Sequence, residues 1–130
     1  IEWVNDSKAT NVDSVWYALQ SMTRPTVWIA GGTDKGNDYT PLKEFAQKKV
    51  KALVCMGLDN EKLVSEFSDI VPKVVSCSSL DDAMRAAQSL ASDGDTVLLS
   101  PACASFDLFK NYEQRGELFK EWVRENVINK

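Results

Sequence analysis

The chain has 130 residues, of which 44% are hydrophobic and 26% charged, a balance typical of one soluble globular domain. A domain of this size can bury a core without disulfides or metal ions. Its formal net charge of −4 argues against nucleic acid as the main partner, and no stretch approaches the length of a membrane span.

The three cysteines are not arranged as metal ligands. Cys55, Cys77 and Cys103 show no C-x-x-C spacing, and the chain contains no histidine. A zinc site with the usual ligands is therefore not expected. Three thiols cannot all pair within one chain, and two of them lie beside apolar, strand-like runs. We therefore expect reduced and mostly buried cysteines in a reducing compartment.

The first third of the chain alternates between strand-like and helical patterns. It begins in strand-like residues at 1–4 without an initiator methionine, which predicts a piece of a longer chain. Apolar residues at helical spacing predict a helix over about 11–22. The mostly apolar, β-branched run 26–30 is typical of a buried parallel strand, and the glycines at 31–32 break it.

The alternation continues to the end of the chain. Thr40 and Pro41 predict the next helix start, with Thr40 as N-cap and Pro41 in the first turn. Ser79, followed by Asp82, resembles a capping box. The remaining predicted elements are strands at 52–56, 73–76 and 96–99, and helices at about 59–67, 79–92 and 107–126.

This alternation predicts the fold class. Strands that alternate with helices require right-handed crossovers and produce a mainly parallel sheet. We therefore expect residues 1–130 to form a single α/β domain, a Rossmann-like, mostly parallel sheet with helices on both faces. Ligands of such sheets bind outside the carboxyl ends of the strands, so the loops that follow the strands are the first candidates for a site.

Three of these loops have the composition of anion-binding segments. Residues 5–11 include Lys8, residues 31–38 include Lys35, and residues 100–105 are small or carry hydroxyls. Small residues let backbone N–H groups approach an anion, and lysine supplies a compact charge for carboxylate or phosphate. Each feature also has a purely structural interpretation: the lysines could be ordinary exposed residues, and the two glycines could form a tight turn. The loop at 31–36 lacks the G-x-x-x-x-G-K-[S/T] spacing of a triphosphate-binding P-loop.

The same loops resemble the C-terminal domain of the Mur ligase family, in its D-glutamate-adding branch. The resemblance rests on NDSKATN at 5–11, a Gly-Gly-x-x-Lys loop at 31–35, and LSPACASFD at 99–107 with FKNYEQRG at 109–116. These motifs occur in the family's order and span almost the whole chain. Thr33-Asp34 departs from the commoner Asp-Gly of the family, which leaves the conformation of that loop open.

The resemblance implies an ATP-dependent ligase. ATP transfers a phosphoryl group to the carboxylate of UDP-N-acetylmuramoyl-L-alanine, which gives an acyl phosphate. The amine of D-glutamate then attacks this carbonyl, phosphate leaves the tetrahedral intermediate, and Mg²⁺ offsets the phosphate charge. Asp6 is then expected to face the ribose hydroxyls of the nucleotide, and Lys8 to be the catalytic residue at the nucleotide or acyl phosphate. The resemblance implies that a UDP-binding domain and a central ATPase domain are absent from this chain, and that the central domain carries the P-loop and the metal ligands. Alone, this chain should be inactive.

Four residues are implied to hold D-glutamate. Thr10 and Lys35 would bind one carboxylate, and Ser105 with the backbone N–H of Tyr112 would bind the other. The last role requires a free N–H, and therefore a helix that starts near Asn111. The hydrophobic pattern alone allows a start near 107, so we expect a break or a tight turn between these two positions. The family often has phenylalanine where this chain has Tyr112, and a backbone contact survives that change.

Two other functions stay open at this point. A related ligase, such as a folylpolyglutamate synthase-like enzyme, would share the fold, although the NDSKATN motif argues against it. A non-catalytic Rossmann-like binding module would assign the same loops to structure. For the ligase, the expected location is the cytoplasm. Its expected partners are D-glutamate, UDP-N-acetylmuramoyl-L-alanine, ATP and the missing domains of its own chain.

Overall fold

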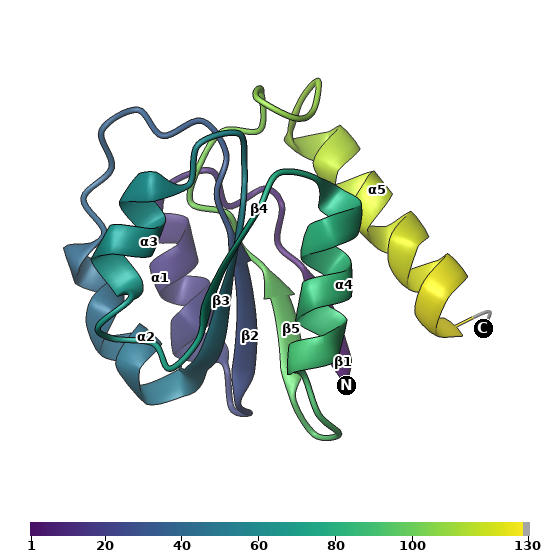
Figure 1. Ribbon diagram of the computed structural model, residues 1–130, viewed down its shortest axis with the longest axis horizontal. Coiled ribbons are helices and arrows are strands. Elements are labelled where there is room, and N and C mark those ends of the chain that lie inside the picture. Colours follow the sequence, from purple (N-terminus) through teal and green to yellow (C-terminus); the bar gives the residue numbers. More distant parts are fainter. Residues whose placement is uncertain (129–130) are drawn as a thin grey trace.

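The computed structural model describes residues 1–128, which fold into three layers (Figure 1). Five strands form one parallel sheet in the order β1-β5-β2-β3-β4. The elements are β1 (Glu2–Asn5), α1 (Val12–Ser21), β2 (Thr26–Ala30), the 3-10 helix η1 (Thr40–Leu42), α2 (Lys43–Lys49), β3 (Val50–Met56), α3 (Glu61–Phe67), β4 (Val74–Cys77), α4 (Leu80–Leu90), β5 (Thr96–Leu99), α5 (Tyr112–Val123) and the π-helix η2 (Arg124–Ile128).

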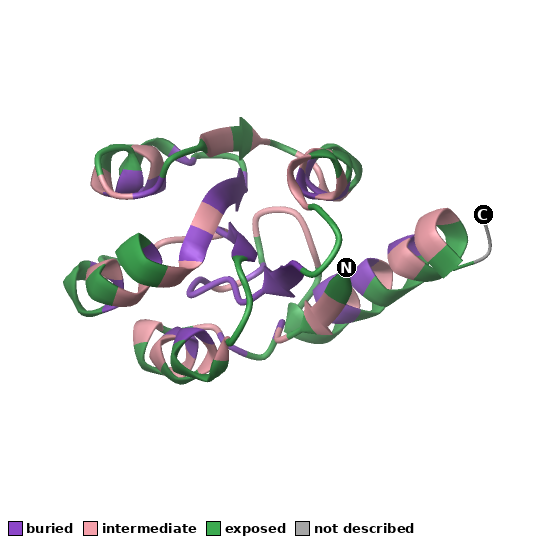
Figure 2. Cartoon of the chain, turned by 90° about the horizontal axis from the view of Figure 1, so that it is seen from below, coloured by how far each residue is buried: buried purple, intermediate pink, exposed green. Residues whose placement is uncertain are grey.

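The two faces of the sheet bury separate apolar cores. Strand β2 is buried along its whole length, and alternate residues point to opposite faces. Trp28 and Ala30 pack in the core that includes α1, α2 and α3, whereas Val27 and Ile29 pack in the core that includes α4 and α5. In Figure 2 the inner strands are buried and the outer surfaces of the helices are exposed. The predicted Rossmann-like α/β class is therefore confirmed.

Most predicted elements are confirmed to within a few residues. Strands β2 and β5 have the predicted bounds, because each is a short apolar run between turn residues. The predicted cap of α4 is confirmed, since the Ser79 side chain accepts from the Asp82 N–H. Cys55, Cys77 and Cys103 are free thiols, and the first and last are buried. No helix within residues 1–128 is long and apolar enough to cross a membrane.

One predicted helix start is wrong, and the structure decides between the two starts that the sequence allowed for the last helix. Thr40 is the first residue of η1 rather than an N-cap, because its N–H donates to Asp38 and the cap position falls on Tyr39. The last helix begins at Tyr112 rather than 107, since the Ser105 carbonyl closes a separate turn by accepting from Leu108 and Phe109. A start near Asn111, which the Tyr112 role required, is the one observed.

Candidate functional site

Three loops meet at the carboxyl edge of the sheet. Because β5 lies between β1 and β2, the loop that follows β5 runs between the other two (Figure 1). Backbone hydrogen bonds join them: the Ala102 N–H donates to Ala9 O over 2.9 Å, and the Thr33 N–H to Ala104 O over 2.8 Å. The edge predicted from the alternation of elements is thus a continuous surface of three bonded loops.

The loop after β1 presents one carboxylate and one free cation. Asp6 is half-buried, and its Oδ2 accepts from the Ser100 hydroxyl over 2.9 Å. Burial raises the pKa of Asp6, and the Ser100 hydrogen bond only partly offsets this rise. Lys8 is exposed and forms no ion pair within residues 1–128. The Thr10 N–H donates to Lys8 O, so both residues lie in one tight turn.

The loop after β2 begins with two glycines that no other residue could replace without displacement of the backbone. Gly31 and Gly32 have φ values of +127° and +139°. A Cβ on Gly32 would lie 2.1 Å from Ala104 O, and one on Gly31 would lie 2.6 Å from Met56 O. Lys35 follows in the same loop, where it is exposed and has no ion-pair partner in the described part of the chain.

The loop after β5 carries hydrogen-bond donors without protein partners. Ser105 is 2% exposed, and its hydroxyl forms no hydrogen bond among the described residues. Asn111 caps α5, its side chain accepting from the Gln114 N–H over 2.8 Å. Tyr112 is therefore the first helical residue, and the N–H groups of a first turn have no acceptor within the helix. This loop offers a hydroxyl and a backbone N–H to a ligand.

One cavity at this edge brings together three of the expected residues. It has a volume of about 440 Å³ between the loop after β1 and the start of α5, and Asp6, Lys8 and Tyr112 line it. Thr10, Lys35 and Ser105 do not line it. Within residues 1–128 no group of three or more His, Cys, Asp or Glu side chains is placed to hold a metal ion. The cavity thus combines one carboxylate, one lysine and the first residue of α5.

Sequence reasoning missed the residue that joins these loops. Arg115 is 1% exposed, and it donates to Ser7 Oγ over 2.9 Å, Ser7 O over 2.8 Å and Cys103 O over 3.1 Å. Ser7 Oγ in turn donates to Tyr112 O over 2.6 Å. Burial lowers the pKa of Arg115 to about 10, so it stays charged at neutral pH. The sequence did contain one signal for its burial: Arg115 lies four residues before the buried Phe119 and therefore on the same face of the helix.

Comparison with known proteins identifies the family. The family model described as "Mur ligase, glutamate ligase domain" matches residues 1–103. Proteins called UDP-N-acetylmuramoylalanine--D-glutamate ligase from Christiangramia forsetii and Bacteroides fragilis are 57% and 59% identical over 122 and 126 residues. One from Cytophaga hutchinsonii is 55% identical over 125 residues.

These relatives also cover the third motif, most of which lies beyond the residues matched by the family model. The matches include 94%, 96% and 96% of this chain but only 27%, 28% and 28% of the relatives, so the chain spans just over a quarter of their length. The coverage of the family model and the identity to these relatives agree with the motifs at the three loops. The chain therefore belongs to the Mur ligase family and corresponds to its glutamate ligase domain.

Proposed function

We propose that the protein containing this chain joins D-glutamate to UDP-N-acetylmuramoyl-L-alanine with ATP, in the cytoplasmic synthesis of peptidoglycan precursors. The observation that carries the proposal is the meeting of three loops at one edge, where Lys8, Lys35 and the Ser105 hydroxyl have no partner among residues 1–128. Exposed ammonium groups and a hydroxyl are suitable donors to carboxylate or phosphate oxygens, which supports an anionic ligand at this edge. The names of the relatives support the reaction.

In this proposal the domain binds D-glutamate by both carboxylates. Thr10 and Lys35 hold one carboxylate, and Ser105 and the N–H of Tyr112 hold the other. The free Tyr112 N–H at the start of α5 supports this assignment, because a helix N-terminus also favours negative charge. A site with paired donors for two carboxylates should reject amino acids that lack the second, since its polar groups would be left unpaired.

The nucleotide lies on the other side of the same edge. When bound, ATP supplies the phosphoryl group that activates the carboxylate of UDP-N-acetylmuramoyl-L-alanine. Lys8 stabilises the negative charge at the transferred phosphate, and Asp6 accepts hydrogen bonds from the ribose hydroxyls. The shared cavity lined by both residues supports this pairing. The P-loop and the Mg²⁺ ligands are assigned to parts of the protein outside this chain.

The test is a steady-state assay of the full-length protein. It measures phosphate release and incorporation of labelled D-glutamate, with L-glutamate and D-aspartate as competing amino acids. Lys35→Ala should raise KM for D-glutamate by about tenfold or more, because it removes a charged hydrogen bond to the substrate. Lys73→Ala is the matched control, since Lys73 is an exposed lysine just before β4. Unchanged kinetics in Lys35→Ala would refute the role of Lys35, and a preference for L-glutamate would favour a folate-type ligase.

A further inference from the structure

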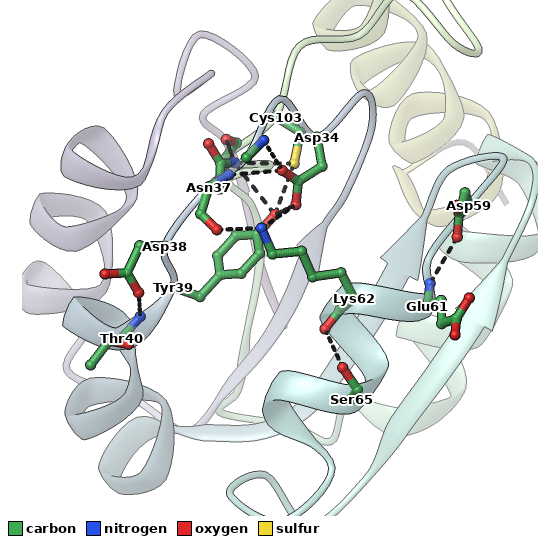
Figure 3. Close-up of polar contacts among 12 residues, drawn as sticks. Asp34, Asn37, Asp38, Tyr39, Thr40, Asp59, Glu61, Lys62, Ser65 and Cys103 are labelled. Carbon is green, nitrogen blue, oxygen red and sulfur yellow. Dashed lines mark hydrogen bonds and ion pairs between the residues drawn. The ribbon is translucent and has the colours of Figure 1, made fainter.

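A buried tyrosine lies beneath the loop that presents Lys35 (Figure 3). Tyr39 is 1% exposed, and its hydroxyl donates to Asp34 Oδ2 over 2.8 Å. Because the single hydroxyl proton goes to Asp34, the Tyr39 oxygen is left to accept from Asn37 Nδ2 at 3.4 Å and from the Cys103 thiol at 3.3 Å. Burial raises the pKa of Tyr39 above its ordinary value of 10.0, so the hydroxyl keeps this proton at neutral pH.

Asp34 organises the turn on either side of Lys35. Its Oδ1 accepts from the N–H groups of Gly36 and Asn37 over 2.8 and 2.9 Å, so residues 34–37 wrap around one carboxylate. Lys62 of α3 lies 3.5 Å from Asp34 Oδ2 (Figure 3). Burial alone would raise the pKa of Asp34, but these hydrogen bonds and the Lys62 charge outweigh it and hold the pKa below its ordinary value. The turn therefore closes on a charged carboxylate.

The same network connects the Lys35 loop to the loop that carries Ser105. Asn37 Nδ2 donates to Ala102 O over 2.9 Å, and Tyr39 contacts Cys103. Lys62 also donates to Asn37 O, and its ammonium group lies 5.4 Å from the centre of the Tyr39 ring. Three elements thus hold the turn from below: α3, the segment before η1 and the loop after β5.

We propose that Asp34 and Tyr39 are positioning residues that set the separation between the Lys35 ammonium group and the Ser105 hydroxyl, and hence the length of dicarboxylic amino acid that the site accepts. This inference rests on the proposed function. It answers the question left by Thr33-Asp34, the pair that departs from the family's commoner Asp-Gly. In this chain the turn is organised by the Asp34 carboxylate, which accepts from the N–H groups of Gly36 and Asn37.

The inference predicts a change in selectivity as well as in affinity. In the full-length protein, Tyr39→Phe keeps the ring and its packing but removes the hydroxyl. We expect KM for D-glutamate to rise about fivefold, with kcat changed less than about twofold and KM for ATP unchanged. The preference for D-glutamate over D-aspartate, which is one methylene shorter, should fall by about as much. A residue that only stabilised the fold would leave this preference unaltered.

A conservative pair of variants tests the carboxylate. Asp34→Asn retains an oxygen that can accept from Gly36 and Asn37, whereas Asp34→Ala removes it. Asp34→Ala should therefore raise KM for D-glutamate, whereas KM in Asp34→Asn should stay close to the wild-type value. Tyr17→Phe is the control for Tyr39→Phe, because Tyr17 is 67% exposed on α1 and lies far from the turn in sequence. If Tyr39→Phe does not fold, the Asp34 pair still decides the question.

Hydrogen exchange of the Gly36 and Asn37 amides provides a readout that needs no substrate. In the full-length protein without ligand, both amides should exchange faster in Asp34→Ala than in wild type. Faster exchange with unchanged KM and selectivity would overturn the positioning role, as would a Tyr39→Phe KM within twofold of wild type. A wild-type protein that does not use D-glutamate would instead refute the proposed function, while faster exchange would still support the way in which Asp34 holds the turn.

Discussion

The guanidinium of Arg115 donates two hydrogen bonds to Ser7, one to its hydroxyl over 2.9 Å and one to its carbonyl over 2.8 Å, although the two residues are 108 positions apart in the sequence. Its third hydrogen bond, to Cys103 O, fixes the loop after β5 to the same centre. The first loop, the last loop and the start of α5 therefore share one buried cation. No acidic side chain within residues 1–128 forms an ion pair with it.

Loss of this cation should destabilise the fold. Arg115→Met leaves the carbonyls of Ser7 and Cys103 buried without donors, so we expect the free energy of unfolding to fall by about 2–4 kcal/mol. Urea denaturation measures the change. Arg85→Met is the control, since Arg85 is exposed on α4 and should leave the midpoint where it is. A loss below about 0.5 kcal/mol in Arg115→Met, the range of ordinary surface changes, would contradict this account.

Two of the three glycines with positive φ in the loop after β2, Gly32 and Gly36, should differ in their tolerance of substitution. Gly32→Ala places a Cβ 2.1 Å from Ala104 O, whereas a Cβ on Gly36 meets no atom within 4 Å. Both alanines bear the cost of a left-handed backbone, but only the first also forces two loops apart. We expect the free energy of unfolding to fall by about 2–4 kcal/mol in Gly32→Ala and by about 1 kcal/mol in Gly36→Ala, as measured by thermal or urea unfolding. Equal losses would show that the backbone, not the contact, dominates.

Ser105→Ala should separate binding from stability. The Ser105 hydroxyl has no hydrogen-bond partner in the described part of the chain, so its removal should change the free energy of unfolding by less than about 0.5 kcal/mol. In the full-length protein the same change should raise KM for D-glutamate about tenfold, because it removes a donor to a carboxylate. A variant that loses stability but keeps its KM would assign Ser105 to structure instead.

The Asp34 carboxylate should give the fold a defined acid sensitivity. Its pKa is lower in the folded chain than its ordinary value of 3.8, so the charged form stabilises folding. This stabilisation is complete above pH 3.8 and is lost as the pH falls through the lower folded-state pKa. The difference in unfolding free energy between wild type and Asp34→Asn should therefore be constant from about pH 7 to 5 and shrink below about pH 4. Urea midpoints of both proteins across this pH range measure the difference. A difference that grows as the pH falls would contradict a lowered pKa of Asp34 in the folded chain.

Local chemistry explains why so much of the fold was predictable. Strand β2 is a continuous apolar run, β-branched or aromatic for the most part, and α1 and α4 begin at side chains that accept from the first-turn N–H groups. The start of the last helix was harder to predict, because the hydrophobic pattern allows a start near 107 while the Ser105 carbonyl and the Asn111 cap close two separate turns. Competing hydrogen bonds of this kind leave little trace in hydrophobic spacing.

The sequence by itself determined the α/β class, the loops that follow the strands and the family motifs within them, because these depend on neighbouring residues. The tertiary structure alone decided which side chains organise the edge. The grip of Arg115 on Ser7 and the contact of Tyr39 with Cys103 join segments 108 and 64 residues apart, and each exists because burial leaves those polar groups no water to bind. The roles of Asp6, Lys8, Thr10, Lys35, Ser105 and Tyr112 toward ligands stay predictions, since they concern contacts with molecules outside the chain.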